Sequence, residues 1–134
     1  MIYLLDTTAF SALMRRAQSV RARIANLSSN DRVLICAITR GEILYGVSRL
    51  AQGKRRQGLE AEATALFNEL ECVSVPETAA DHYADVKLAA EKQGTPLDEN
   101  DLWIAATALS LSAVLVTTDT DFQRVSTLKV EDWT

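Results

Sequence analysis

The sequence predicts an α/β domain whose central, mainly parallel sheet of four to five strands is covered by helices on both faces. Two observations lead to this fold class. Short segments that are apolar throughout alternate with longer segments of helical periodicity. The 134 residues, 48% of them hydrophobic and 24% charged, suffice for one compact core and leave little room for a second. We therefore expect residues 1–134 to form a single domain.

The expected strands are continuous apolar runs, because strands covered on both faces bury both sets of side chains. They lie at residues 2–5, 33–38, 73–75 and 114–117, with a short edge strand possible at residues 128–130. The expected helices show apolar residues at helical spacing. They fall within residues 10–27 and at residues 43–50, 59–70, 78–93 and 99–111.

The net charge of −4 argues against nucleic-acid binding by overall electrostatic attraction, so any such contact must be local. Basic residues do cluster near expected helix ends, where solvated ends and phosphate contacts are about equally plausible for each cluster alone. These residues are Arg15, Arg16, Arg21, Arg23, Lys54, Arg55 and Arg56. The N-terminal segment has no export signal and no apolar run that could span a membrane, so we expect a cytoplasmic protein.

The two cysteines and the single histidine argue against zinc, redox and histidine-dependent mechanisms. Cys36 and Cys72 lie in short apolar runs without CxxC spacing or histidine neighbours, which favours buried thiols over a zinc or redox site. His82 is the only histidine, so a Ser-His-Asp or Cys-His mechanism would depend on it alone.

Four acidic residues follow strands or begin helices, and ligands of such sheets bind beyond the carboxyl ends of the strands. Asp6 ends the first strand, Glu42 opens the helix after the second, Asp101 lies in the first turn after Pro96, and Asp119 follows the fourth strand. Each has a structural alternative. Asp6 and Asp119 would serve as N-caps, Thr39 and Glu42 as a capping box, and Asp98 with Asp101 at a helix start. The four together are harder to explain by capping.

Two carboxylates about 5 Å apart repel by roughly 3 kcal/mol at an effective dielectric constant near 20, so four of them require a cation. An all-oxygen, histidine-free set suits Mg²⁺ or Mn²⁺ and not Zn²⁺. Such ions promote hydrolysis of phosphodiesters. The acids therefore predict a metal-dependent phosphodiester hydrolase.

Five segments in order resemble the successive motifs of PIN-domain ribonucleases, in particular VapC-like toxins. They are IYLLDTTAFS, ITRGEILYG, NDLWIAATAL, LVTTDTDF and LKVEDW, and they span essentially the whole chain. The resemblance implies a three-layer domain and an endoribonuclease of a toxin-antitoxin pair. It also implies a VapB-like antitoxin whose tail lies over the active-site groove, and a homodimer.

The resemblance also implies residue roles. The acidic metal ligands would be Asp6, Glu42, Asp101 and Asp119, with Thr7 and Thr117 supporting the site and Asp121 holding metal through water. Asp98 fits less well and is expected to be a helix cap, and Trp103 is expected in the core. Arg15, Arg16 and residues 54–56 would contact RNA or the partner.

Three rival interpretations remain. An aspartyl-phosphate phosphohydrolase would need a second aspartate at position 8, where Thr8 stands. A receiver-like or metal-sensing module would bind a cation without turnover, but receivers place an aspartate after the third strand, where Pro76 and Glu77 follow here. A degenerate relative acting only through its partner is disfavoured because all four acids are present.

Overall fold

The computed structural model describes residues 1–134, which fold around one five-stranded sheet. All strand pairs are parallel, in the order β3-β2-β1-β4-β5. The strands are β1 (Ile2–Leu5), β2 (Arg32–Cys36), β3 (Glu71–Val73), β4 (Val114–Val116) and β5 (Val130–Glu131). The predicted fold class is confirmed.

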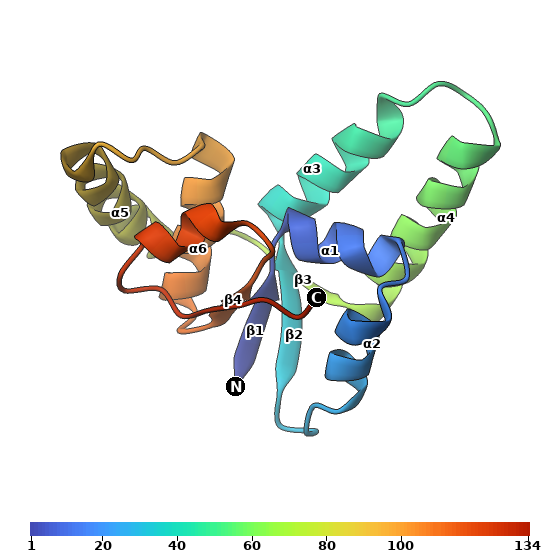
Figure 1. The fold of residues 1–134 in the computed structure, drawn as a ribbon, viewed down its shortest axis with the longest axis horizontal. Coiled ribbons are helices and arrows are strands. Elements are labelled where there is room, and N and C mark those ends of the chain that lie inside the picture. Colours follow the sequence, from blue (N-terminus) through green and yellow to red (C-terminus); the bar gives the residue numbers. More distant parts are fainter.

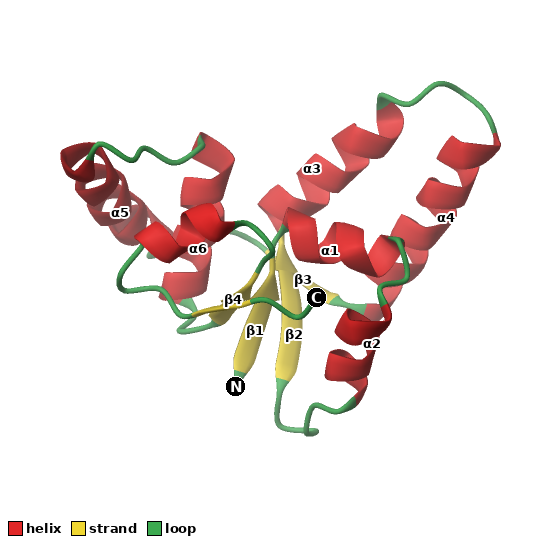
Figure 2. Cartoon of the chain, in the orientation of Figure 1, coloured by secondary structure: helices red, strands yellow, loops and turns green.

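Helices cover both faces of this sheet (Figures 1 and 2). They are α1 (Thr7–Met14), α2 (Gln18–Ala25), α3 (Ala37–Ser48), α4 (Lys54–Glu69), α5 (Ala79–Gln93), α6 (Glu99–Ser110) and the 3-10 helix η1 (Thr120–Arg124). Side chains of α1 to α4 share one apolar cluster, and those of α5, α6 and η1 share another. None of the helices combines the length and the apolar character that crossing a membrane requires.

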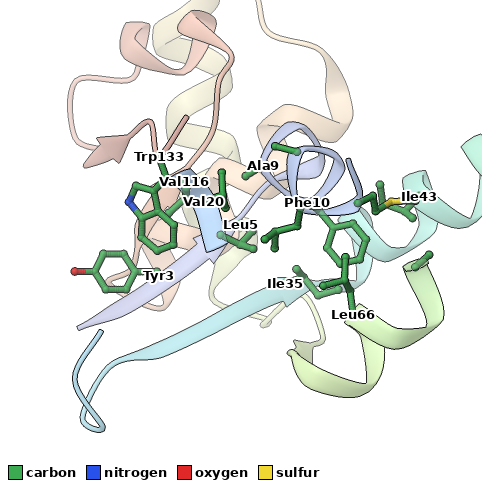
Figure 3. Packing of buried hydrophobic residues seen from close by; sticks show 14 of the residues in the cluster. Tyr3, Leu5, Ala9, Phe10, Val20, Ile35, Ile43, Leu66, Val116 and Trp133 are labelled. Atoms are coloured by element: carbon green, nitrogen blue, oxygen red, sulfur yellow. The ribbon is translucent and has the colours of Figure 1, made fainter. Parts of the chain in front are cut away.

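The alternation of side chains along β1 connects the sheet to both clusters. Tyr3 and Leu5 belong to the cluster under α1, whereas Leu4, between them, belongs to the cluster under α6. Figure 3 shows Phe10 of α1 within the first cluster, where it is fully buried. Burial of one such side chain contributes about 1.5–3 kcal/mol. These contacts hold the starts of the helices against the carboxyl ends of the strands.

Several predicted boundaries were wrong. Helix α3 begins at Ala37 and not at residue 43, because its first turn is largely polar or exposed and shows no apolar periodicity. The second strand accordingly ends at Cys36, and the fifth occupies Val130–Glu131 instead of residues 128–130.

Strand β3 also differs from its prediction, since it covers Glu71–Val73 and not residues 73–75. It lies at the edge of the sheet and pairs only with β2, so exposed residues are tolerated in it. Cys72 is therefore exposed, contrary to prediction, whereas Cys36 is buried as expected.

Candidate active site at the carboxyl ends of the strands

Asp6 is held at the end of β1 by groups from the start of α1 and from the loop after β4. Its Oδ1 accepts hydrogen bonds from the Ala9 backbone N–H (2.9 Å) and the Thr8 hydroxyl (2.7 Å), so the predicted N-cap of α1 is confirmed. Its Oδ2 accepts a hydrogen bond from Thr117, which follows β4, at 2.5 Å. The side chain is buried, which raises the pKa of the Asp6 carboxyl, while these hydrogen bonds lower it in part.

Asp119 lies in the same loop after β4. Its backbone N–H donates to the Thr117 hydroxyl at 2.9 Å, and its Oδ1 caps η1 by accepting from the Asp121 N–H at 2.9 Å. Its Oδ2 accepts no hydrogen bond from the chain. Capping therefore occupies one oxygen of this carboxylate and leaves the other available.

Glu42 reaches the site from within α3, beyond its first turn, so the prediction that it opens the helix was wrong. The proposed capping box is also absent, because Cys36 is the N-cap residue and no side chain caps the helix. Glu42 Oε1 instead accepts from the Thr7 hydroxyl at 2.5 Å, and Oε2 accepts from Asn100 Nδ2 at 3.4 Å. Contacts from α1 and α6 thus orient this carboxylate.

Asp101 lies in the first turn of α6, as predicted. Its pKa is raised to about 7, first by burial and then by repulsion from Asp98, Asp119, Glu42 and Asp6. Three of these repelling groups are the other predicted acids, so Asp101 interacts electrostatically with Asp119, Glu42 and Asp6. We call these four carboxylates the acidic rim. Asp98 caps α6, as expected, through Oδ2 and the Asn100 N–H (3.2 Å), and it also adds to the negative charge at Asp101.

The four acids are neighbours without forming a closed coordination shell. No group of three or more acidic, cysteine or histidine side chains has the arrangement of a metal site. Asp121 is directed elsewhere, into an ion pair with Arg124 at 3.0 Å. The donor set still fits a hard divalent cation, since all its ligating atoms are oxygens and the repulsion at Asp101 is what such a cation would relieve.

Comparison with known proteins identifies the family of this chain. The family model described as "PIN domain" matches residues 3–128. The chain belongs to the PIN-domain family. Its full length is 39% identical to "Ribonuclease VapC1" of Haemophilus influenzae, covering 99% of that protein.

Solved structures of similar PIN domains show the same fold. The chain aligns with VapBC2 of Rickettsia felis bound to a promoter DNA fragment, with a TM-score of 0.91 and 27% identity over 100% of both chains. It aligns with VapBC-1 of nontypeable Haemophilus influenzae with a TM-score of 0.87 and 36% identity, over 99% of this chain and 98% of the other.

The predicted basic residues of this PIN domain separate into two groups. Arg15 and Arg55 line an open hollow that also borders Thr7 and Glu42. The others are engaged elsewhere or lie apart from the acids. Arg16 pairs with Glu62, Arg23 with Glu131 and Arg56 with Glu60, Arg21 donates to the Leu13 carbonyl, and Lys54 begins α4 in an exposed position.

Two residues of the PIN-domain site were missed by the sequence analysis. Thr8 donates to Asp6 and accepts from the Thr118 N–H at 2.9 Å, which ties the start of α1 to the loop after β4. Asn100 contacts Glu42. Thr8 directly follows the predicted site residue Thr7, and Asn100 directly precedes Asp101, and that adjacency was the only available signal. Trp103, half-buried, stacks on Tyr83 with ring centroids 4.0 Å apart and so has an intramolecular aromatic partner.

Proposed function

We propose that this PIN domain is a divalent-metal-dependent endoribonuclease that hydrolyses RNA phosphodiester bonds as the toxin of a toxin-antitoxin pair. The full-length similarity to a protein named as a ribonuclease supports the reaction and the substrate class. The observation that carries the proposal is the environment of Asp101, whose pKa is raised to about 7 first by burial and then by repulsion from neighbouring carboxylates. Such a rim needs a cation, and no lysine or arginine forms a salt bridge with these four carboxylates.

Asp6, Glu42, Asp101 and Asp119 would hold Mg²⁺ or Mn²⁺, and Asp121 would join them through water after leaving Arg124. An ion of this kind acidifies water and offsets charge on phosphate oxygens. Other residues of the chain orient the carboxylates that would bind the metal. Thr8, Thr117 and the Ala9 N–H orient Asp6.

A cognate VapB-like antitoxin would inhibit the enzyme by covering the rim. The related solved structures named VapBC support this partnership. The hollow next to Glu42 supports it too, because five of its lining residues are hydrophobic and Arg15 and Arg55 also line it. Apolar floors with charged borders suit an amphipathic protein segment. Homodimer formation and a cytoplasmic location belong to the same proposal.

The test uses protein purified free of antitoxin and a structured RNA. We expect cleavage with Mg²⁺ or Mn²⁺ that stops on addition of EDTA, and products with 5′-phosphate and 3′-hydroxyl ends. Asp119→Asn should abolish cleavage, whereas Asp85→Asn, which removes an exposed carboxylate of α5, should not. Cyclic phosphate ends would show that the ribose 2′-hydroxyl attacks and would contradict the proposal.

A further inference from the structure

Tyr45 is unusually exposed for a large side chain. At 68% exposure it is the most exposed large hydrophobic residue of the chain. The guanidinium of Arg49 lies 5.8 Å from its ring centroid, which is a cation–π contact, and no other aromatic ring stacks on it. The fold gains little from an aromatic ring at this position, so its role has to be sought outside the folded chain.

The position of Tyr45 connects it to the acids. Glu42, Tyr45 and Arg49 are spaced by three and four residues, so they share one stripe of α3. One open hollow is lined by Glu42 and Asn100 from the acidic rim and by Gly46, Tyr45 and Arg49 along the helix. A chain bound across the acids would therefore continue over this stripe.

The same stretch of α3 contains two glycines that the fold does not require. A Cβ atom added to Gly41 or Gly46 would meet nothing within 4 Å. Glycine inside a helix costs roughly 1 kcal/mol relative to alanine, so both positions weaken α3 without relieving any internal contact. Their effect is to keep the helix backbone accessible beside Tyr45.

Charge on the two sides of Glu42 favours an anionic ligand. Arg49 takes part in no salt bridge, and neither do Arg15 and Arg55. Arg15 and Arg55 line the hollow described with the active site, here called the second hollow, which shares Thr7 and Glu42 with the hollow beside Tyr45. In a chain of net charge −4, these three arginines form a local cationic border on two sides of Glu42. Free guanidinium groups bind phosphates through bidentate hydrogen bonds.

We propose that this stripe of α3 binds single-stranded RNA beside the scissile phosphate, with a base stacked on Tyr45 and a backbone phosphate on Arg49. The inference rests on the proposed ribonuclease function and names the substrate's binding surface. Unpaired bases of RNA are recognised by stacking on aromatic rings and arginine planes. The second hollow, beside Arg15 and Arg55, has five hydrophobic lining residues against three along this stripe, so it suits a protein segment better.

The experiment compares three variants on a short unstructured RNA whose cleavage site has been mapped with the unaltered protein. Tyr45→Ala should lower kcat/KM by about 5-fold to about 150-fold, the range that corresponds to one base-aromatic stack. Tyr45→Phe should retain most of the activity because it keeps the ring. Leu44→Ala, which removes another exposed apolar side chain of α3 that lines neither hollow, should cleave normally.

A second arm uses RNAs with a single abasic nucleotide at each position around the cleavage site. At the stacked position the abasic RNA should be cleaved more slowly by the unaltered protein, and Tyr45→Ala should add no further loss. Thermal unfolding of each variant shows that it is folded.

The outcomes separate the two proposals. If the unaltered protein cleaves RNA and Tyr45→Ala cleaves it equally well, the stacking inference is overturned and the nuclease proposal stands. If Tyr45→Ala cleaves normally but escapes inhibition by the antitoxin, the stripe binds protein and the inference is also overturned. If the unaltered protein cleaves no RNA with metal present, the ribonuclease proposal itself fails and the inference fails with it.

Discussion

Thr117 donates its hydroxyl hydrogen to Asp6 across two adjacent parallel strands, at 2.5 Å. Both side chains are buried, so this hydrogen bond has no competing water. The carboxyl ends of β1 and β4 are thereby joined at the atoms that the proposed chemistry uses.

Thr117→Val removes this donor while keeping the side-chain shape. We expect it to lower the free energy of unfolding by about 1–3 kcal/mol, the cost of leaving a buried acceptor unsatisfied. RNA cleavage should fall as well, because Asp6 loses its orientation. Thr117→Ser keeps the hydroxyl and should recover most of the activity. Urea denaturation and initial rates measure the two effects, and a fully stable valine variant would show that the hydrogen bond contributes little.

Asp101→Asn should abolish cleavage while leaving the metal-free protein at least as stable at pH 8. The folded-state pKa of about 7 lies above the ordinary value of 3.8, so the folded state binds the extra proton between these values. The free energy of unfolding contributed by Asp101 is therefore highest at low pH and falls as pH rises toward 7. Asparagine removes this slope, which chemical denaturation from pH 4 to pH 8 detects. A clear loss of metal-free stability would favour a helix-capping role instead.

Mg²⁺ or Mn²⁺ should raise the melting temperature more at pH 8 than at pH 5.5. Protons compete with the cation for Asp101 below its pKa of about 7, and a ligand that binds only the folded state stabilises it. Differential scanning fluorimetry measures this without reference to activity. Asp85→Asn should keep the full metal effect and Asp119→Asn should reduce it. A metal effect that is the same at both pH values would argue against these ligands.

Gly46→Ala should stabilise the fold and impair the enzyme. Alanine in a helix interior is favoured over glycine by about 0.5–1 kcal/mol, and the added methyl group meets no atom of the chain. The same methyl group would enter the hollow beside Tyr45 and lower kcat/KM on RNA. Gly58→Ala is the matched control, since Gly58 is an equally open helical glycine of α4 and lines neither hollow. Equal activity of both variants would contradict the proposed RNA surface.

The sequence by itself determined the strand order along the chain and the positions of three acids. Continuous apolar runs identify buried strands, and Asp6 and Asp119 follow such runs directly. Asp101 stands just after Asp98, which caps its helix. These are local features, so residue patterns suffice to locate them. The prediction that Glu42 opens its helix was wrong for a local reason too. The first turn of α3 lacks the apolar periodicity that indicates a helix.

Only the tertiary structure decided which side chains meet. Asn100 contacts Glu42 across 58 residues, and the Thr118 N–H donates to Thr8 across 110 residues. Neither contact has a sequence signal, because each depends on how segments from different parts of the chain are seated together on the sheet. The side chains at the rim are placed by the packing of Leu5, Phe10 and the residues around them, and packing distances are set by the whole core at once.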